Sequence, residues 1–313
     1  MSLSKKLVSV VVPVYNEEQM IVEVYDRVNK VFKNSDKYSY ELVFFDDGST
    51  DGTREAIEKL SEKYPNVKAV FYAKNFGYMK NTFYAMQQAK GDCAFLLHAD
   101  LQNPPELIPA FLEKWGNGAK VVLGIKNKSK ENAFVYFLRT IFYFLMIHFF
   151  GVNIIAHCTE FELFDKDFIN VLRNVRTNNP FLRGIVSEYA FKKDYIYYTQ
   201  DSREKGKSKF NLNKYYDFAL CGITQYSKKL PRRIIGACAI GFVLVLIEML
   251  FIFLPSVKNI PIYEISSHFI LRILIVCLLA LIVLVSILFE YVIQIADNSN
   301  KKPFIIEEKR INY

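Results

Sequence analysis

The chain lacks the residue patterns that mark several common protein classes. Its five cysteines are odd in number and show neither a C-x-x-C pair nor the Cys/His spacing of metal ligands, which excludes a disulfide-rich scaffold and disfavours a zinc site. We expect reduced, mostly buried thiols in a reducing compartment. Neither glycine-rich phosphate-binding pattern, G-x-G-x-x-G or G-x-x-x-x-G-K-S/T, occurs, which disfavours a dinucleotide-binding fold and a P-loop enzyme.

Charge and hydropathy place the chain between soluble and membrane proteins. It has 313 residues, a formal net charge of +8 and 51% hydrophobic residues, which is more apolar than most soluble enzymes. The composition excludes a disordered chain, and the length allows one large core with an appendage or two ordinary domains. The excess cations gather beside two apolar segments and in a loop near Arg203, so the basic charge does not indicate nucleic-acid binding.

Two apolar segments, 234–254 and 269–295, are each long enough to cross a bilayer, which takes about 20 residues. Cations precede the first and follow the second, whereas the connector holds only Lys258. By the positive-inside rule, both termini are expected in the cytoplasm. No signal peptide is visible, so the sequence predicts a multi-pass protein of the inner or plasma membrane with a cytoplasmic first domain. The flanking cations are Lys228, Lys229, Arg232, Arg233, Lys301, Lys302, Lys309 and Arg310.

Two further segments indicate helices at the membrane surface. Residues 134–150 are strongly aromatic but are interrupted by Arg139, which favours an interfacial helix over a span; a core helix of the first domain is the alternative. A weaker interfacial candidate covers 211–227. Within the two spans, Glu248 and Arg272 lie at similar depths, so we predict a contact between them, with separate snorkelling as the alternative.

The first part of the chain alternates between buried strands and helices. Apolar, β-branched runs predict strands, and apolar residues after each run recur at helical spacing. The predicted strands are Leu7–Val14, Glu41–Phe45, Val67–Tyr72 and Cys93–Leu97. This alternation predicts an α/β domain with a mainly parallel sheet, whose ligand lies beyond the carboxyl ends of the strands. We expect this domain over 1–230, a membrane domain over 231–298 and a cytoplasmic tail over 299–313.

Carboxylates gather in the loops that follow these strands. Glu17, Asp46, Asp47 and Asp100 stand where a phosphate-binding glycine loop would otherwise be expected. Acidic side chains approach a diphosphate through a divalent cation, so the loops predict a metal-bridged nucleotide. In the last of these loops, Asn103 is expected to cap a helix that Pro104 opens.

Four motifs in combination resemble those of a known family. They are Val12-Pro13-Val14-Tyr15-Asn16-Glu17, Asp46-Asp47-Gly48-Ser49-Thr50-Asp51, Asn75-Phe76-Gly77 and Ala99-Asp100-Leu101-Gln102-Asn103-Pro104-Pro105-Glu106. The chain resembles glycosyltransferase family 2 with a Rossmann-like GT-A fold, and specifically the membrane-bound polyisoprenyl-phosphate glycosyltransferases that use undecaprenyl or dolichyl phosphate. The resemblance continues through 203–210 and 289–291 and covers nearly the whole chain.

The resemblance implies roles for residues near the ends of the predicted strands. Residues that would bind the nucleotide are Pro13, Tyr15, Glu17, Asp46, Asp47, Lys74 and Asn75. Residues that would bind a divalent metal, Mn²⁺ or Mg²⁺, are Asp100, His98 and Gln102. Asp100 and Glu160 would be catalytic, and Asp47 could orient its loop instead of contacting the nucleotide.

His98 is a departure from the family, which has an acid at this position. Imidazole can bind a borderline cation such as Mn²⁺, whereas Mg²⁺ prefers hard oxygen ligands, so His98 could change the metal preference. The alternative is a histidine at the end of a strand that is hydrogen-bonded to a neighbour.

Glu160 stands in a Thr-Glu-Phe-Glu-Leu segment where the family has Gly-Asp-Phe-Arg-Leu, so it would replace the aspartate thought to act as base. The presumed acceptor, a phosphate monoester with a second pKa of about 6, is already largely anionic at neutral pH. Positioning then matters more than deprotonation. A surface acid in a loop is the alternative interpretation of Glu160.

A basic loop would bind the acceptor phosphate. By the resemblance, the acceptor residues are Arg203, Lys207, Ser208, Lys209 and Arg183, with Lys205 and Gly206 in the same loop. Their charges and backbone N–H groups suit a phosphate, although contact with anionic lipids alone is the alternative. The family has arginines where this chain has Gln200 and Pro180.

The resemblance implies an inverting, metal-dependent transfer of a hexose from a nucleotide sugar, expected to be a UDP-sugar, to undecaprenyl phosphate at the cytoplasmic membrane face. The product would supply a lipid-linked donor for cell-envelope glycans, and a homo-oligomer is expected. One alternative is mannosyl transfer like that of dolichyl-phosphate mannose synthase. Another is a non-catalytic relative that binds lipid or partner proteins. A processive polysaccharide synthase is disfavoured, because its Q-x-x-R-W motif is missing around the only tryptophan, Trp115.

Overall fold

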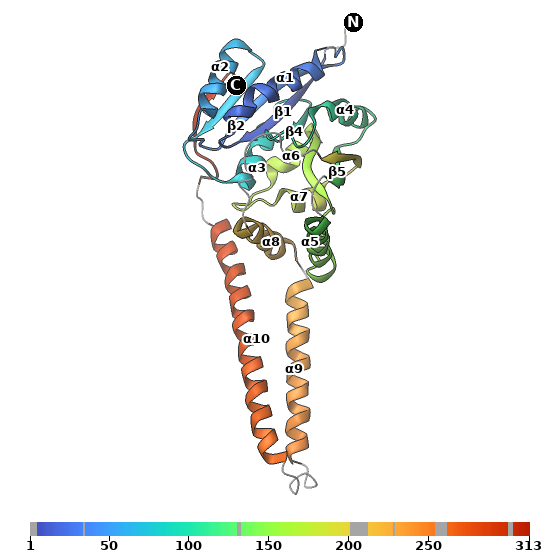
Figure 1. Cartoon of the computed structure of the whole chain (residues 1–313), viewed down its shortest axis with the longest axis vertical. Helices are drawn as coiled ribbons and strands as arrows, with labels where there is room; N and C mark the ends of the chain where they lie inside the picture. The colour runs from blue at the N-terminus through green and yellow to red at the C-terminus, as the bar shows by residue number, and fades with distance from the viewer. Residues whose placement is uncertain are drawn as a thin grey trace.

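The computed structural model describes residues 5–33, 35–129, 133–200, 212–227, 229–253, 262–299 and 303–313. An α/β body holds both ends of the described chain (Figure 1). Two long helices, α9 (Lys229–Phe253) and α10 (Ile262–Ser299), leave the body together as a pair, which we call the rod. Two shorter helices, α5 (Ala133–Phe144) and α8 (Leu212–Tyr226), lie where the rod joins the body.

The body is built on one 8-stranded sheet in the order β7-β5-β6-β4-β1-β2-β3-β8. The strands are β1 (Lys6–Val14), β2 (Tyr38–Asp46), β3 (Val67–Tyr72), β4 (Cys93–Leu96), β5 (Val121–Ser129), β6 (Cys158–Asp165), β7 (Lys193–Gln200) and β8 (Glu307–Ile311). Parallel pairs join β1 to β2 and β4, β2 to β3, and β5 to β7. Only β6 and β8 run antiparallel to their neighbours, so they begin where the other strands end. The predicted α/β class with a mainly parallel sheet is confirmed.

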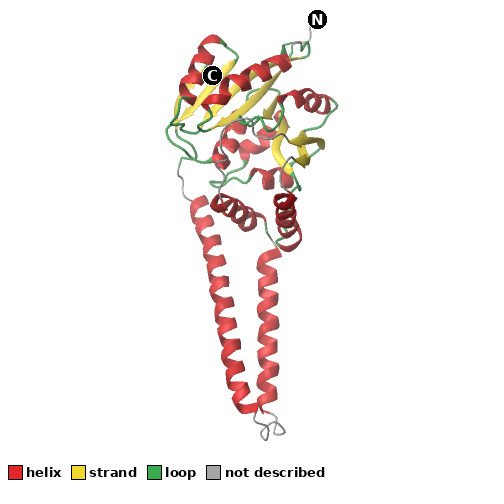
Figure 2. Cartoon of the chain, viewed as in Figure 1, coloured by secondary structure: helices red, strands yellow, loops and turns green. Residues whose placement is uncertain are grey.

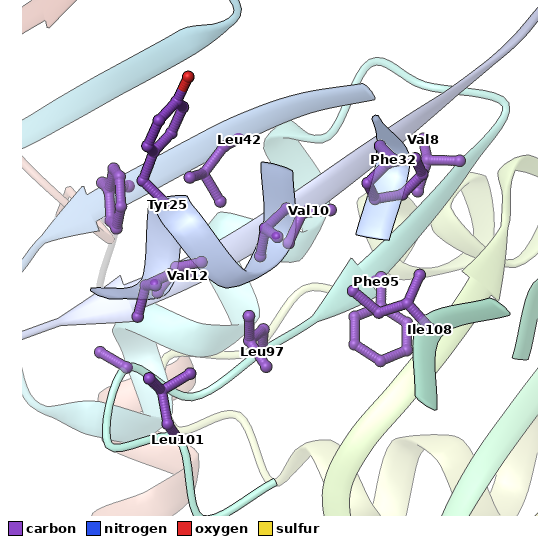
Figure 3. Packing of buried hydrophobic residues seen from close by; sticks show 14 of the residues in the cluster. Val8, Val10, Val12, Tyr25, Phe32, Leu42, Phe95, Leu97, Leu101 and Ile108 are labelled. Atoms are coloured by element: carbon purple, nitrogen blue, oxygen red, sulfur yellow. The ribbon is translucent and has the colours of Figure 1, made fainter. Parts of the chain in front are cut away.

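Helices cover both faces of the sheet (Figure 2). On one face lie α1 (Ile21–Phe32), α2 (Thr53–Lys63) and α4 (Ile108–Gly116), and on the other lie α3 (Tyr78–Gln88), α6 (Lys166–Asn174) and α7 (Leu182–Tyr189). Successive residues of a strand point to opposite faces, so Val10 and Val12 enter the first core and Val11 the second. Figure 3 shows the first core, including Phe32 of α1 and Ile108 of α4. Burial on both faces explains why the strands are continuously apolar.

One local prediction is wrong. Asn103 does not cap the helix after Pro104: its side chain is fully buried, and its Oδ1 accepts a hydrogen bond from the Tyr198 hydroxyl at 2.6 Å. Pro104 itself precedes the 3₁₀ turn η2 (Pro105–Leu107), and no side chain caps this turn. A buried amide needs a partner in the core. Here the partner lies 95 residues away on β7, where no local pattern reveals it.

The aromatic segment expected at 134–150 forms α5 followed by a π-helical turn, η3 (Leu145–Phe149). Phe144 and Phe149 are 59% and 47% exposed, whereas Tyr143 and Met146 are buried against the body. This turn also holds the start of the rod, because Arg233 of α9 donates hydrogen bonds to the carbonyls of His148 and Phe149. The segment is therefore amphipathic and lies at the base of the rod.

The rod carries apolar side chains on its outside. Phe242 on α9 and Phe289 on α10 are each 65% exposed. Within the described residues, one segment is long and apolar enough to cross a membrane, Ile273–Asp297, and none of it is buried by protein. The other expected span, 234–254, and the expected Glu248–Arg272 contact lie partly or wholly outside the residues whose side chains are described. An apolar surface of this extent favours an apolar surrounding.

All five cysteines are free, as expected. Cys93, Cys158 and Cys221 are buried in the body and its base. Cys238 and Cys277 are exposed because they lie on the rod helices.

The C-terminal segment has a structure that the sequence reasoning did not assign to it. Residues 299–313 were expected to be a tail, but β8 within them pairs antiparallel with β3 and closes one edge of the sheet. Phe304 and Tyr313 pack against the second core. The chain thus returns from the rod to complete the same sheet in which it began (Figure 1).

Glu162 is a buried acid at the centre of the sheet. It lies on β6 opposite Leu96 of β4 and Leu123 of β5 and is 0% exposed. Its Oε1 accepts a hydrogen bond from the Cys158 thiol at 3.1 Å, and within the described part of the chain its Oε2 has no partner. Burial, together with the charge of Glu160, raises the pKa of Glu162 to about 8. The folded protein therefore holds this carboxyl protonated at neutral pH.

Glu162→Gln should remove a pH dependence of stability. The folded carboxyl has a pKa near 8, far above that of the unfolded chain, so its contribution to stability is complete at about pH 4 and is lost as the pH rises towards about 8. The variant keeps a neutral group and should gain in thermal unfolding midpoint relative to wild type as the pH rises from about 5 to about 8. Glu113→Gln, an exposed acid on α4, is the matched control. Parallel pH profiles for wild type and both variants would contradict the assignment.

Candidate functional site

The carboxyl edge of the sheet gathers the polar residues that the sequence singled out. Strands β1, β2, β3 and β4 end there, and β6 begins there because it runs antiparallel to β4. This edge therefore brings together the loops after β1, β2, β3 and β4 and the first residues of β6. This edge also contains residues in the left-handed backbone region, which residues other than glycine seldom adopt. The φ angles of Asn16, Leu101, His157 and Glu160 lie between 52° and 59°. Strain of this kind is typical of functional sites.

The loop after β1, which holds Pro13, Tyr15 and Glu17, is joined to the loop after β2. The Asn16 N–H donates to Ser49 Oγ at 2.8 Å, and the Thr50 N–H donates to Asn16 Oδ1 at 2.7 Å. The Glu17 N–H donates to Thr53 Oγ1 at 2.9 Å. The two predicted nucleotide loops are therefore one rigid unit. Pro13, Tyr15 and Glu17 are half-buried, so part of each side chain reaches the surface of this unit.

Asp47 orients the loop after β3. Its two oxygens accept hydrogen bonds from the N–H groups of Phe76 at 2.7 Å and Gly77 at 2.9 Å. Burial raises the pKa of Asp47 to about 6 in spite of these bonds. Asp47 thus orients the loop after β3, and its expected contact with the nucleotide stays a prediction. Lys74 and Asn75, in the loop that Asp47 holds, are exposed.

Gly48 allows this loop to pass close to the one after β2. Its φ is +68°, and a Cβ there would lie 2.6 Å from the Lys74 carbonyl carbon and 2.8 Å from the Asn75 nitrogen. Asp46, just before it, is fully buried and accepts from the Ser49 N–H and from Arg54 Nε at 3.0 Å. The residues after β2 and β3 that were predicted to bind the nucleotide thus lie side by side.

Tyr78 joins the loop after β4 to β6. Its hydroxyl donates to Glu160 Oε2 at 2.5 Å and lies 3.0 Å from His98 Nε2. Because a tyrosine has one proton, donation to Glu160 leaves its oxygen as the acceptor for His98. His98 Nε2 then carries the hydrogen, and Nδ1 of a neutral ring keeps the lone pair that a metal requires. The hydrogen-bonded interpretation of His98 and its ligand role are therefore compatible.

Glu160 is not the surface acid of the alternative interpretation, because it is 3% exposed. Arg183 Nε donates to its Oε1 at 2.9 Å, and Arg183 Nη1 donates to the Tyr143 hydroxyl at 3.3 Å. Arg183, expected at the acceptor phosphate, is thus bound to the candidate base. The two oxygens of Glu160 are held by Arg183 and Tyr78, which fixes the carboxylate in one orientation.

Asp100 and Gln102 form the turn after β4. Asp100 Oδ1 accepts from the Gln102 N–H at 3.2 Å, across Leu101 with its φ of +52°. Among the described residues, no group of three or more His, Cys, Asp or Glu side chains lies close enough to hold a metal ion. His98 and Asp100 alone could supply a partial set of ligands, which fits cations that complete their shell with substrate phosphates and water.

A cationic cluster that is connected to Glu160 through Arg183 and Tyr143 was not predicted from the sequence. Its cations are Lys126 on β5 and Arg139 on α5, and His157, just before β6, lies next to Lys126, whose N–H donates to the His157 carbonyl at 3.1 Å. Burial and then Arg139 lower the pKa of Lys126 to about 8, and burial followed by Arg139 and Lys126 lowers that of His157. The ring of Tyr143, the partner of Arg183, lies 5.0 Å from that of His157. The only sequence signal was Arg139, which interrupts an otherwise aromatic helix.

The predicted acceptor residues Arg203, Lys207, Ser208 and Lys209 lie outside the described residues. The strand before them, β7, is parallel to β5 and ends with Gln200. Gln200 Nε2 donates to Asn103 Oδ1 at 3.4 Å, so this strand end is tied to the loop after Asp100.

Comparison with known proteins gives a consistent result. The model of the family described as Glycosyl transferase family 2 matches residues 9–190. The uncharacterized glycosyltransferase YkcC of Bacillus subtilis (strain 168) is 33% identical over 307 residues, which cover 96% of this chain and 93% of that protein. A prophage bactoprenol glucosyl transferase homolog of Escherichia coli (strain K12) is 34% identical over 221 residues, which cover 70% of this chain and 72% of that protein.

Among solved structures, glucosyl-3-phosphoglycerate synthase from Mycobacterium tuberculosis in complex with uridine diphosphate has a TM-score of 0.50. It is 15% identical, and the match covers 70% of this chain and 78% of that chain. At this identity the likeness concerns the fold alone, and it agrees with the GT-A-like architecture expected from the motifs.

Proposed function

Because this chain belongs to glycosyl transferase family 2 and is a glycosyltransferase, we propose that it transfers a hexose from a nucleotide sugar to a polyprenyl phosphate at the cytoplasmic face of a membrane. A UDP-hexose is the proposed donor and undecaprenyl phosphate the proposed acceptor. The relative from Escherichia coli, whose name describes a bactoprenol glucosyl transferase homolog, supports the lipid acceptor.

One observation carries the proposal: contacts connect Glu160 to the acidic edge through Tyr78 and to the cationic cluster through Arg183 and Tyr143. On one side, Tyr78 connects it to His98 and hence to the loop of Asp100. On the other side, Arg183 and Tyr143 connect it to His157. A nucleotide diphosphate bound through a divalent cation suits the first side, and a phosphate monoester suits the second. The two substrates would meet at Glu160.

The chain's own residues position the reactants. An oxygen of the acceptor phosphate attacks the anomeric carbon, and the bond from that carbon to the diphosphate breaks, with the electron pair leaving on the diphosphate. Attack from the opposite face inverts the configuration. A bound Mn²⁺ or Mg²⁺, held by His98, Asp100 and Gln102, would neutralise the charge that develops on the diphosphate. Pro13, Tyr15, Glu17, Asp46, Lys74 and Asn75 would hold the nucleotide.

The main role of Glu160 would be to orient the acceptor, because little deprotonation of the acceptor phosphate is needed. A phosphate monoester is mostly dianionic above its second pKa of about 6, so it is already a nucleophile at neutral pH. The fixed carboxylate, held by Arg183 and Tyr78, can accept the remaining proton when the monoanion binds. Asp100 would act with the metal at the leaving group.

The base of the rod would place this site at the membrane surface. The exposed aromatic side chains of α5 and η3 lie beside the start of α9, as an interfacial segment requires. We propose that α9 and α10 both span the membrane, with the α/β body and both termini in the cytoplasm. The cationic cluster on β5 and α5 would then receive the lipid phosphate at the depth of the headgroups, together with the loop 203–209.

The direct test incubates membranes that contain the protein with undecaprenyl phosphate and radiolabelled nucleotide sugars, with and without Mn²⁺. We expect label in the lipid fraction with one hexose donor, and a loss of about a hundredfold in rate for Glu160→Gln, because the acceptor loses its orientation. Retention of a labelled donor with no labelled lipid for any sugar would favour the non-catalytic alternative. Labelling from GDP-mannose alone would favour the mannosyl alternative.

Lys126→Gln should weaken acceptor binding selectively. Loss of one charge-assisted contact to phosphate is worth about 1.5 to 3 kcal/mol, so the KM for undecaprenyl phosphate should rise about ten- to hundredfold. The KM for the donor should stay unchanged. Lys166→Gln is the matched control, because Lys166 is exposed and follows the end of antiparallel β6, at the opposite edge of the sheet. Equal acceptor KM values for both variants would exclude the cluster as a phosphate site.

His98→Asp should shift the metal preference towards Mg²⁺, because a carboxylate replaces an imidazole. The measurement is the ratio of turnover with Mg²⁺ to turnover with Mn²⁺, which should rise about tenfold or more. Tyr78→Phe serves as the control, since it removes the hydroxyl that His98 contacts without changing the ligand. An unchanged ratio in His98→Asp, or the same change in both variants, would argue against a ligand role.

A further inference from the structure

The last strand of the chain reaches the nucleotide side of the site. Because β8 runs antiparallel to β3, it begins at the edge where β3 ends, with Glu307 opposite Tyr72. The Ala73 N–H also donates to the Ile306 carbonyl at 3.0 Å. The first residues of β8 therefore lie beside the loops that hold Asp46 and Asp47, although more than two hundred residues separate them in the sequence.

Arg54 connects the last strand to Asp46. Its Nε donates to Asp46 Oδ2 at 3.0 Å, and its Nη2 donates to Glu308 Oε2 at 3.0 Å. Nη2 also donates to the Tyr72 carbonyl at 2.7 Å, and the guanidinium lies 5.5 Å from the centre of the Phe71 ring. A planar guanidinium with several fixed donors can make these contacts at once, which an ammonium cannot.

The Asp46 carboxylate is held from two directions. The Ser49 N–H donates to both its oxygens, at 3.3 and 3.2 Å, and Arg54 binds Oδ2. The Asp46 side chain is 1% exposed, the Arg54 side chain 29% and the Glu308 side chain 53%. The buried carboxylate thus depends on Arg54, and Arg54 depends in part on a residue at the surface of β8.

We propose that Arg54 and Glu308 are positioning residues for the nucleotide, so that donor affinity depends on the strand that follows the rod. The proposal rests on the proposed function, because it assigns Asp46 to the donor. Glu308 holds the guanidinium in the plane that meets both Asp46 and the Tyr72 carbonyl. When Glu308 loses its charge, Arg54 turns more freely, and Asp46 is less often in the orientation that the donor requires.

Other contacts hold β8 in place, so a change at Glu308 does not detach the strand. Lys309 Nζ binds Glu58 Oε1 at 2.7 Å, and the Tyr84 hydroxyl donates to Glu307 Oε1 at 2.7 Å. Asn312 Nδ2 donates to the carbonyls of Ser61 and Val67 at 2.8 and 2.9 Å. The backbone pairs with β3 are also independent of the Glu308 side chain.

The experiment compares the full-length protein in detergent with Glu308→Gln, Arg54→Lys and the double variant. Glu58→Gln is the matched control, because it removes the ion pair between Glu58 of α2 and Lys309 of β8, which does not involve Arg54 or Asp46. Equilibrium dialysis with UDP and with GDP gives nucleotide affinity, and steady-state assays give the donor KM, the acceptor KM and kcat. Thermal unfolding midpoints show that each variant is folded.

Glu308→Gln should weaken nucleotide binding and raise the donor KM about two- to fivefold, as expected for a partly exposed ion pair, with kcat and acceptor KM unchanged. Arg54→Lys should have the larger effect. The double variant should be no weaker than Arg54→Lys alone, because Glu308 acts through Arg54.

Nucleotide affinity in Glu308→Gln equal to that in Glu58→Gln, or additive effects in the double variant, would overturn this inference and leave the proposed function intact. Absence of UDP and GDP binding in the wild-type protein would overturn the proposed function and the inference together.

Discussion

The site depends on the direction of one strand. Because β6 runs antiparallel to β4 and β5, its first residues reach the edge where the parallel strands end. Glu160 therefore meets Tyr78, which follows the loop after β3, and through it His98 in the loop after β4. A parallel strand would begin at the opposite edge. The ion pair between Glu160 and Arg183 then fixes α7 against the sheet. Through Tyr143, the same pair positions α5 and the base of the rod.

This arrangement is costly to build, since it buries charges and uses strained backbone. A carboxylate that is 3% exposed is stable only when its partners are in place. Arg183 and Tyr78 supply both of them, and a φ of +56° at Glu160 is held by the surrounding contacts. Burial of apolar side chains in the two cores offsets this unfavourable free energy. In return, the carboxylate is oriented before any substrate binds, which reduces the reorganisation needed during the reaction.

Much of the fold follows from local sequence, but the site follows from it only in part. The apolar strands near Val10, Phe44 and Val70 are visible because both faces of a parallel strand are buried. The loops after them were located for the same reason. β8 was not predicted because it is a short, charged edge strand. Its residues are not buried, so the sequence has no apolar pattern there. The cluster of Lys126 and His157, and the Asn103–Tyr198 bond, join residues far apart in the chain, which periodicity cannot reveal.

The position of β8 also sets an order on biosynthesis. A ribosome makes this strand after both helices of the rod, so the outer edge of β3 lacks β8 while the rod is being synthesised. An open edge of this kind is prone to pair with other chains. Copies in which β8 does not pair with β3 would leave that edge open and would be prone to aggregation and proteolysis. The contact of Arg54 with Glu308 would thus form only after both helices of the rod have been made.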